Sequence, residues 1–495
     1  MSCITRFAPS PTGFLHIGNA RTALINFLYA KQKDGLFILR IDDTDTLRCE
    51  IKFLLSILEN LSWLKLHWDK AFNQLERKDL YKAVVENLKK NGKIYPCYEA
   101  KEELESKRAL QIQKGKPPIY DRQALMLTKN QIEQFNKSGR TPHYRFLLNK
   151  DETVTWKDLI KGPVKFEGET LSDPVVLRED GTITYLLSSV IDDVEEQITD
   201  IVRGEDHVSN TAIQIQLFKA LKAFVPNFGH LSLLHNTQGK ISKRQGGEDL
   251  NSMRQYLHPM AINSFMTFLG TSQPIDLHQN MEDLVKSFNI STYSKAQTHY
   301  HEDELQKMNA KLLKSLSYES VQKLKSNKLQ KRDDAEPYSE HRASKILTSW
   351  QQPLISQELC SFPGLSQNLW EKIKYNVQSI SEIDLWCKIL EEEPKYSDID
   401  VQYLELAANI LPVVIDENTS KIWLQKLSEI TQKKGKDLFL PIRLALTGLK
   451  DGPNLSDLLL VLGRDAVIKR LTGLNQKKGC SNLPKRASAR NNPSV

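Results

Sequence analysis

The spacing of apolar residues predicts a strand, a turn and a helix at the start of the chain. Residues 4–8 alternate as in a strand and include β-branched and aromatic side chains. Residues 9–13 combine prolines with a glycine, which predicts a turn. From about Gly18 onward, apolar residues recur at helical spacing. His16 is therefore expected where the strand and its turn give way to the helix.

A second apolar run, residues 36–41, predicts another strand, and an acidic run follows it directly. The acidic run contains Asp42, Asp43 and Asp45. Open parallel sheets bind their ligands outside the carboxyl ends of the strands. We therefore expect His16 and the acidic run to meet at one edge of an α/β sheet.

Two short motifs that lie far apart in the chain together predict an ATP site at this edge. They are residues 16–19, His-Ile-Gly-Asn, and residues 240–244, Lys-Ile-Ser-Lys-Arg. A glycine turn that opens a helix offers backbone N–H groups and the positive end of the helix dipole to a phosphate. The imidazole of His16 and the ammonium groups of Lys240 and Lys243 would neutralise the negative charge that develops there.

Later segments predict a nucleotide-binding fold that is interrupted and then followed by helices. The interruption contains a charged helical stretch at 101–114 and strand-like segments at 143–148 and 163–167. After it come a buried strand at 199–203 and a helix at 210–223, and beyond residue 251 the pattern is helical. A basic stretch at 323–332 predicts a linker, and the basic tail 476–495 predicts disorder.

Composition changes this picture only slightly. The chain has 495 residues, 40% of them hydrophobic, which is enough for several domains. Its formal net charge of +7 suits a partner that carries phosphates, but it is also common in proteins that bind no nucleic acid. The six cysteines are scattered singly, which indicates reduced thiols. No signal-peptide pattern and no run of about 18 apolar residues occurs, so we expect a cytoplasmic protein without a membrane span.

The chain resembles the class I aminoacyl-tRNA synthetases and, within them, the bacterial glutamyl-tRNA synthetases. Five segments carry the resemblance, in the order that the family has them: residues 6–24, 39–45, 185–193, 201–207 and 240–244. A weaker similarity continues through residues 436–448 and Leu471. Motif matches of this kind are hypotheses that structural context must confirm.

The resemblance implies an α/β Rossmann-like class I synthetase catalytic domain with an α+β acceptor-binding insertion, followed by all-α stem-contact and anticodon-binding domains. The expected boundaries are 1–95 and 185–250 for the catalytic domain, 96–184 for the insertion, 251–325 for the stem-contact domain, 326–475 for the anticodon-binding region and 476–495 for the tail. Within the insertion, Arg122, Arg140 and Arg145 are candidates for contacts to tRNA, with a solvated surface role equally open.

The resemblance also implies a two-step reaction. L-glutamate attacks the α-phosphate of ATP, which carries Mg²⁺, and a ribose hydroxyl of the terminal adenosine of tRNA(Glu) then takes the glutamyl group. Whether tRNA(Gln) is also charged stays open, and we expect a monomer. The catalytic candidates are His16, Lys240 and Lys243. The ATP-binding candidates are His16, Gly18, Asn19, Asp206, Leu234, Lys240, Ser242 and Lys243. The glutamate-binding candidates are Arg6, Ala8, Ser10, Asp42, Tyr185, Ser189 and Arg203.

The chemistry of these residue types fits the substrate. Two carboxylates call for guanidinium groups such as Arg6 and Arg203, and an ammonium calls for an acid such as Asp42. At two positions the chain departs from the family, which often has glutamate in place of Asp42 and asparagine in place of Ser189. The shorter Asp42 would lengthen the ammonium contact or bridge it by water.

Some relatives hold zinc with closely spaced cysteines that begin near the position of Cys97. Here the next cysteine is Cys360, and zinc needs four ligands that are usually Cys or His at close spacing. We therefore predict no zinc and no other metal site in the protein itself.

Two other functions remain to be weighed. A glutaminyl-tRNA synthetase would carry β-barrels where this chain predicts helices. The presence of His16, Lys240 and Lys243 argues against a noncatalytic tRNA-binding paralogue. The departures from the family at Asp42 and Ser189 keep that alternative open. Exchange of pyrophosphate into ATP would separate the paralogue from an enzyme.

Overall fold

The computed structural model describes residues 2–236, 239–240, 249–324, 338–349, 362, 364–392, 394 and 400–473. The chain forms two compact units, and each is described by itself. The first comprises residues 1–309 and 329–357, and the second comprises residues 310–328 and 358–495. Among the described residues, no helix is both long enough and apolar enough to cross a membrane.

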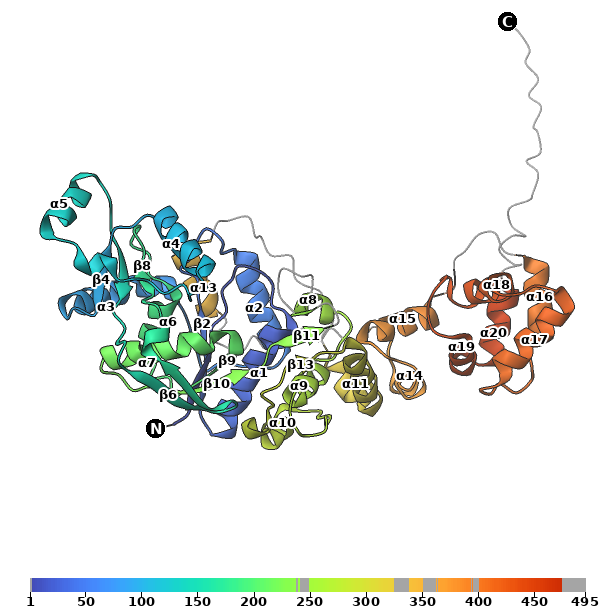
Figure 1. The fold of residues 1–495 in the computed structure, drawn as a ribbon. Coiled ribbons are helices and arrows are strands. Elements are labelled where there is room, and N and C mark those ends of the chain that lie inside the picture. The colour runs from blue at the N-terminus through green and yellow to red at the C-terminus, as the bar shows by residue number, and fades with distance from the viewer. Residues whose placement is uncertain are drawn as a thin grey trace, which may run out of the picture. The chain divides into compact units, whose positions relative to one another are not determined.

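A parallel sheet lies at the centre of the first unit (Figure 1). Strands β1 (Ile4–Phe7), β2 (Leu36–Ile41) and β3 (Lys70–Asn73) pair in that order. Strands β9 (Asp200–Gly204) and β10 (Asn227–Leu231) form a second parallel pair. The pair lies beside β1, because the amide of Thr199 donates to the carbonyl of Ile4 at 3.0 Å. The sheet is therefore completed by strands that come from both halves of the sequence.

Helices cover this sheet and bring polar residues to its carboxyl edge. They are α1 (Ile17–Gln32), α2 (Ile51–Trp63), α3 (Lys78–Lys90), α6 (Tyr185–Glu195) and α7 (Val208–Ala220), with the 3₁₀ turns η1 (Gln74–Arg77) and η4 (Glu205–His207). Asn26 ties α1 to β9, because its amide donates to the carbonyl of Val202 at 2.8 Å. The mouth of the sheet is thus fixed by hydrogen bonds as well as by apolar packing.

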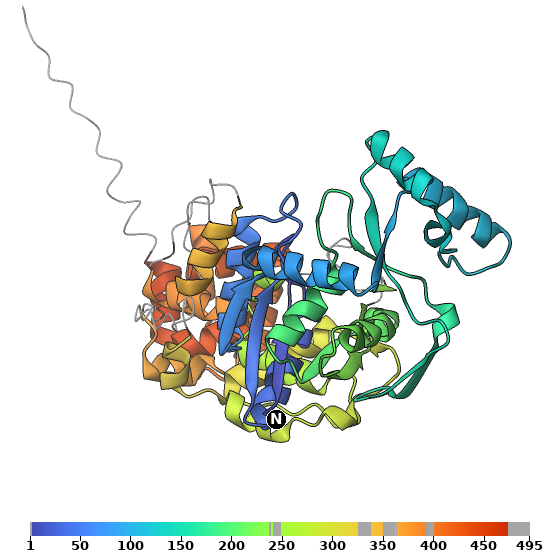
Figure 2. The same cartoon turned by 90° about the vertical axis from the view of Figure 1, so that its left-hand side faces the viewer.

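The insertion between the two halves is an α+β segment. Figure 2 shows its helices α4 and α5, in teal, projecting beyond the sheet. Its elements are β4 (Ile94–Cys97), α4 (Lys101–Gln113), η2 (Gln123–Met126), α5 (Lys129–Lys137), β5 (His143–Phe146), β6 (Thr153–Asp158), β7 (Gly162–Glu167), η3 (Gly168–Thr170) and β8 (Val175–Leu177). Strands β4, β5 and β8 form an antiparallel sheet, whereas β6 and β7 form a hairpin that packs against β10.

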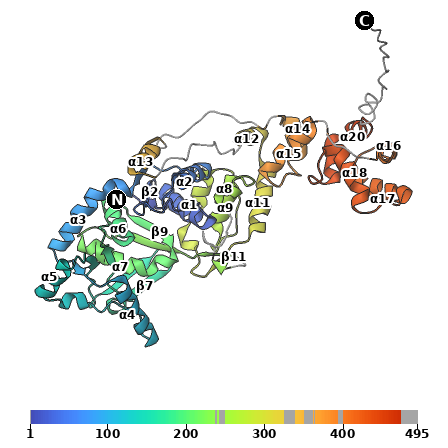
Figure 3. The same ribbon diagram turned by 90° about the horizontal axis from the view of Figure 1, so that it is seen from above.

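The remainder of the first unit is mostly helical. It contains β11 (Leu234–Asn236), β12 (Gly239–Lys240), α8 (Leu250–Met253), α9 (Pro259–Phe268), α10 (Met281–Ser287), η5 (Ile290–Thr292) and β13 (Thr298–His299), and α11 (Glu302–Ser315) leads out of it. Helix α13 (Glu340–Ser349) returns to this unit and packs against β3 at the edge of the sheet (Figure 3). Just before it, the hydroxyl of Tyr338 donates to the buried carboxylate of Asp43 at 2.9 Å.

The second unit is entirely helical in its described residues. Its helices are α12 (Tyr318–Gln322), α14 (Gln367–Ile373), α15 (Ile380–Glu391), α16 (Val401–Asn409), α17 (Thr419–Thr431), α18 (Lys436–Thr447), α19 (Leu455–Leu462) and α20 (Arg464–Thr472). Three tryptophans, Trp370, Trp386 and Trp423, are almost completely buried in it. The indole of Trp423 donates to the carbonyl of Ala407 at 2.8 Å, so this polar group is satisfied inside the core.

The elements expected from the sequence pattern are confirmed with small shifts. The strand at 36–41 is β2 with the same bounds, and the helical stretch at 101–114 is α4. The strand expected at 199–203 is β9, one residue later. The basic tail 476–495 and most of the basic stretch 323–332 lie outside the described residues.

Candidate active site at the mouth of the parallel sheet

A cavity of about 550 Å³ opens at the carboxyl ends of β1 and β9, beside the start of α1. Ten of the predicted residues line it: Arg6, Ala8, Ser10, His16, Gly18, Asn19, Tyr185, Arg203, Asp206 and Leu234. These positions come from sequence segments on both sides of the insertion. The fold therefore brings these ten ATP-binding and glutamate-binding candidates into one cavity.

His16 caps the helix that faces this cavity. Its Nδ1 accepts a hydrogen bond from the backbone N–H of Gly18 at 3.1 Å, and its own backbone N–H donates to the side chain of Asn19 at 3.2 Å. In a neutral imidazole the proton then sits on Nε2, so that nitrogen is the donor of the ring. A Cβ on residue 18 would lie 2.9 Å from Cε1 of His16, so only glycine allows the ring to fold over this turn.

Three further ATP-binding candidates, Asp206, Leu234 and Lys240, belong to the turn after β9 and to the hairpin after β10. Asp206 belongs to η4, and Leu234 opens β11 as a buried residue. Strand β12 pairs with β11, which places the backbone of Lys240 opposite His235. Ser242 and Lys243 lie outside the described residues, so their roles stay predictions.

Two buried arginines reach the cavity from neighbouring strands. Arg6 is 4% exposed, and its Nε lies 3.1 Å from Oδ1 of Asp193 on α6. Arg203 is 5% exposed, and burial lowers the pKa of its guanidinium from the usual value. Its Nη1 donates to the hydroxyl of Tyr185 at 3.4 Å. Two guanidinium groups at one cavity suit a ligand with two carboxylates.

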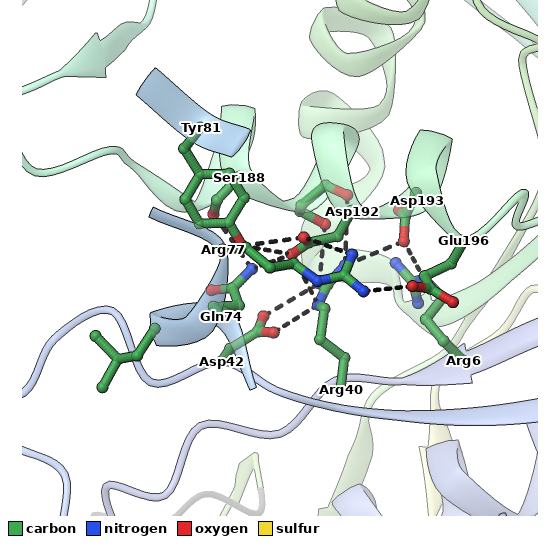
Figure 4. A network of polar contacts seen from close by, with 12 residues as sticks. Arg6, Arg40, Asp42, Gln74, Arg77, Tyr81, Ser188, Asp192, Asp193 and Glu196 are labelled. Carbon is green, nitrogen blue, oxygen red and sulfur yellow. Dashed lines mark hydrogen bonds and ion pairs between the residues drawn. The ribbon is translucent and has the colours of Figure 1, made fainter. Parts of the chain in front are cut away.

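Asp42 and Ser189 bind Arg40 and are not among the residues that line the cavity. Figure 4 shows the contact between Asp42 and Arg40. Nε of Arg40 lies 2.6 Å from Oδ1 of Asp42, and its Nη2 lies 3.0 Å from Oγ of Ser189. The backbone N–H of Asp42 donates at 3.0 Å to the carbonyl of Pro9, which lines the cavity. The two residues at which the chain departs from the family therefore contact the same guanidinium group, that of Arg40.

A buried network of charged residues continues from Arg40 (Figure 4). Its Nη1 lies 3.0 Å from Oδ1 of Asp193, the carboxylate that also holds Arg6. Asp192 accepts hydrogen bonds from Gln74 at 2.7 Å and from Tyr81 at 2.9 Å. Each buried charge thus has a partner of opposite charge or a hydrogen-bond donor, as burial requires. The network fixes the orientation of Arg6 toward the cavity.

The pKa of Asp42 reflects this environment. Burial raises the pKa of its carboxyl group to about 6, although the attraction of Arg40 opposes the shift. The nearby carboxylate of Asp192 adds to the rise. Arg40 and Asp193 were not assigned roles from the sequence, because the contact between them joins positions far apart in the chain. Both residues lie in segments that carry the resemblance, 39–45 and 185–193, but nothing within either segment marks the two as partners.

His207 and Glu205 lie next to Arg203 in sequence, and His207 also lines the cavity. Burial and the charge of Arg203 lower the pKa of His207 to about 4, and its Nδ1 lies 3.1 Å from the amide of Asn210. Glu205 accepts a hydrogen bond from the backbone N–H of Leu233 at 3.1 Å. Both residues hold the turn that carries the cavity wall.

Two insertion arginines considered for tRNA contacts are engaged inside the protein. Arg122 forms a two-pronged ion pair with Asp173, at 2.8 and 2.9 Å. Arg145 is buried, lies over the ring of Tyr120 and donates to the carbonyl of Asp173 at 2.7 Å. Arg140 is more exposed and donates to the carbonyl of Tyr98 at 3.3 Å. Of these three arginines, Arg140 has the most exposed guanidinium, which also lies 3.6 Å from the carboxylate of Glu103.

Cys97 is a buried cysteine. Its side chain is completely buried, and burial raises the pKa of the thiol to about 12. In the part of the chain that the structure describes, no group of three or more His, Cys, Asp or Glu side chains is placed to hold a metal ion. The absence of zinc stays a prediction for the whole chain.

Two family profiles match the chain. One is described as tRNA synthetases class I (E and Q), catalytic domain, and matches residues 2–307. The other is described as an anticodon binding domain and matches residues 367–474. The first spans more than half of the chain and includes the whole cavity.

Relatives and solved structures agree with the profiles. Glutamate–tRNA ligase 1 from Rickettsia bellii is 47% identical over 474 residues, which are 95% of this chain and 99% of the relative. Glutamate–tRNA ligase 2 from Ehrlichia canis is 43% identical over the same shares of both chains. A crystal structure of a glutamate tRNA ligase from Elizabethkingia meningosepticum in complex with its amino acid superposes with a TM-score of 0.66, at 25% identity, over 96% of this chain and 99% of that chain. The chain therefore belongs to the class I aminoacyl-tRNA synthetases, in the family of the glutamate–tRNA ligases.

Proposed function

We propose that this chain is a glutamate–tRNA ligase that forms glutamyl-adenylate from L-glutamate and ATP and transfers the glutamyl group to tRNA(Glu). The observation that carries the proposal is the cavity in which two buried arginines, Arg6 and Arg203, lie beside the capped start of α1. The full-length similarity to glutamate–tRNA ligases supports the same activity.

The two arginines would bind the two carboxylates of glutamate. Arg6 is held by Asp193, and Arg203 offers Nη1 next to the hydroxyl of Tyr185. The ammonium group is assigned to Asp42. Because the carboxylate of Asp42 is bound to Arg40 and does not line the cavity, a bridging water fits this contact better than a direct one.

The start of α1 would hold the phosphates of ATP. Backbone N–H groups near Gly18 and the helix dipole attract phosphate oxygens, and Nε2 of His16 can donate a hydrogen bond to them. The first step needs no protein nucleophile, because the substrate carboxylate attacks the α-phosphate itself. Negative charge gathers on that phosphate, and we assign its neutralisation to His16, Lys240 and Lys243. Asn19, Asp206, Leu234 and Ser242 complete the proposed ATP site.

Mg²⁺ would reach the site on the triphosphate. The described residues around the cavity offer no acidic cluster that could hold the ion, and ATP phosphates are common magnesium ligands. When bound, the ion would neutralise phosphate charge. The residues of this chain then have the tasks of positioning glutamate and stabilising the α-phosphate.

The second half of the chain would read the tRNA. We propose the stem-contact domain at 251–325, the anticodon-binding region at 326–475 and an acceptor-binding insertion at 96–184 between catalytic segments 1–95 and 185–250. We further propose that the protein is cytoplasmic and monomeric. Light scattering of the purified chain would test the monomeric state.

Charging assays test the proposal directly. Purified tRNA(Glu) and tRNA(Gln) are incubated with ATP, Mg²⁺ and radiolabelled glutamate, with the Lys243→Ala variant as control. We expect wild-type charging of tRNA(Glu) and a loss of about 10²-fold or more in the variant. Charging of tRNA(Gln) as well would mark a nondiscriminating enzyme. No charging of either tRNA, with glutamate or glutamine supplied, would overturn the proposal and favour a noncatalytic paralogue.

A further inference from the structure

A buried chain of hydrogen bonds runs from Asp158 in the insertion to Arg203 in the cavity. We propose that Asp158, His230 and Thr211 act as positioning residues that aim the guanidinium of Arg203 at a carboxylate of glutamate. The inference rests on the proposed role of Arg203 and adds residues that do not touch the substrate themselves.

The chain is continuous and almost completely buried. Nδ1 of His230 lies 2.5 Å from Oδ2 of Asp158, and both side chains are 0% exposed. Nε2 of His230 lies 2.9 Å from the hydroxyl of Thr211, which is also completely buried. Nη2 of Arg203 donates to the same hydroxyl at 2.6 Å. Water is therefore excluded from each link between the carboxylate and the guanidinium.

The acid–base properties of the neighbours set the direction of each hydrogen bond. Burial acts to raise the pKa of Asp158, but hydrogen bonds from His230 and from backbone N–H groups outweigh it and lower the pKa to about 2. Burial lowers the pKa of His230, so the ring is neutral near pH 7. Facing a carboxylate, Nδ1 must carry the proton, which leaves Nε2 as an acceptor.

The tautomer of His230 fixes the hydroxyl of Thr211 in turn. A hydroxyl has one proton and two acceptor lone pairs. Its proton is directed to Nε2 of His230, so a lone pair is directed to Nη2 of Arg203. Arginine is always protonated and can only donate, which matches this arrangement.

The arrangement occupies one end of the guanidinium and leaves the other for a ligand. Nη2 of Arg203 is shared between Thr211 and the amide oxygen of Gln214, at 2.6 and 2.7 Å. Among the described residues, Nη1 makes only the long 3.4 Å contact to Tyr185, and the buried Nε makes no hydrogen bond. A carboxylate in the cavity would accept a hydrogen bond from Nη1.

The origin of the chain is itself rigidly held. Oδ1 of Asp158 accepts hydrogen bonds from the backbone N–H groups of Ile160, Lys161 and His230 at 2.9–3.1 Å. A Cβ on residue 229 would lie 3.3 Å from the side chain of Leu159, so Gly229 allows the hairpin to pack closely on β10. The insertion thus contributes a fixed carboxylate to the glutamate site.

The first experiment compares Thr211→Val with Thr211→Ser in tRNA(Glu) charging. Valine has nearly the same shape as threonine but lacks the hydroxyl, and serine keeps it. We expect Thr211→Val to raise the KM for glutamate by roughly 10-fold, the scale of losing one hydrogen bond to a charged group. The KM for ATP should stay unchanged in Thr211→Val. Thr211→Ser should keep a KM for glutamate close to that of the wild type.

The second experiment tests whether Asp158 acts through Thr211. In Asp158→Asn the amide would donate to Nδ1 and reverse the tautomer of His230, so the hydroxyl proton must turn toward the carbonyl of His207, 3.2 Å away. The KM for glutamate should rise by less than in Thr211→Val. In the double variant, Asp158→Asn should add nothing further.

Asp200→Asn is the matched control for loss of a buried carboxylate. Asp200 lies on the same strand as Arg203, is 3% exposed and accepts hydrogen bonds from Tyr29 and Asn227, away from the cavity. The Asp200→Asn variant should leave the KM for glutamate unchanged even if it lowers the stability of the fold.

Three results would overturn the inference. They are an unchanged KM for glutamate in folded Thr211→Val, an equal rise in the KM for ATP, or failure of Thr211→Ser to restore binding. An unchanged KM for glutamate in Arg203→Lys would remove the role of Arg203 and the chain with it, while charging by the wild type would still support the proposed function. Loss of wild-type charging would instead refute the proposed function.

Discussion

Replacing Gly18 by alanine separates the stability of α1 from its catalytic task. The new Cβ would lie 2.9 Å from Cε1 and 3.0 Å from Nδ1 of His16, closer than carbon atoms normally approach. Both contacts are to the side chain of His16, so the ring can swing away while the backbone stays in place. The hydrogen bond from the N–H of Gly18 to Nδ1 is then lost.

The expected costs differ strongly in size. Loss of one helix cap costs about 1 kcal/mol of stability, which shifts the melting temperature by only a few degrees. Loss of a donor that stabilises the transition state costs about 10²-fold in kcat. In the same variant, thermal denaturation should therefore show a small shift in melting temperature, and steady-state charging of tRNA(Glu) should show a large loss of kcat.

Asn280→Ala provides the matched control. Asn280 caps α10 through a 2.9 Å hydrogen bond from the N–H of Asp283, away from the cavity. This variant should lose similar stability and keep the wild-type kcat. A kcat of Gly18→Ala within about twofold of wild type, with the melting shift present, would refute the role of His16 in stabilising the transition state.

Three further predictions follow from the buried network and its surroundings. Arg40→Met leaves the carboxylates of Asp42 and Asp193 without their shared guanidinium and should cost about 3–5 kcal/mol in urea denaturation, and a cost below about 1 kcal/mol would contradict the network. Burial raises the pKa of Asp42 to about 6, so its carboxyl group gains a proton as the pH falls through 6. The KM for glutamate should therefore rise below that pH. In Asp42→Asn, the KM for glutamate should no longer depend on pH in this range. Tyr338→Phe removes the hydrogen bond to Asp43 and should lower the urea midpoint by the equivalent of about 1 kcal/mol. Limited proteolysis should then cut the chain more readily around α13. An unchanged urea midpoint and an unchanged digestion pattern would argue against the docking of α13.

The strands and helices that surround the cavity could be predicted because local patterns specify them. Strand β2 is a short, mostly apolar run, and α1 follows a histidine cap and has a glycine in its first turn, which suits a helix start. The ATP-binding and glutamate-binding residues that line the cavity were found because they lie in short segments with a recognisable order. Each of these signals is contained within a few residues of sequence.

The partners of those residues could not be predicted in the same way. Arg40 looks like any arginine on a strand, yet it joins Asp42 two residues away to Asp193 in a distant helix. Likewise, Asp158 and His230 are separated by the rest of the insertion and by α7, and only the folded chain brings them together. Such contacts depend on tertiary packing, which spacing along the chain does not encode.

The placement of Asp42 shows a further limit. Its position in the acidic run correctly predicted that it would lie near the edge of the sheet. Its side chain, however, binds Arg40 and does not line the cavity, because a buried carboxylate needs a cationic partner. Residue type and position predicted the neighbourhood but not the orientation.

The most direct test of the central claim is the initial rate at which the purified protein attaches radiolabelled glutamate to tRNA(Glu), measured beside the rate with radiolabelled glutamine. Two buried arginines in the cavity require a second carboxylate on the substrate, so we predict rapid charging with glutamate and none with glutamine. Charging with glutamine at a comparable rate, or no charging with glutamate, would contradict the assignment of Arg6 and Arg203 and the function derived from it.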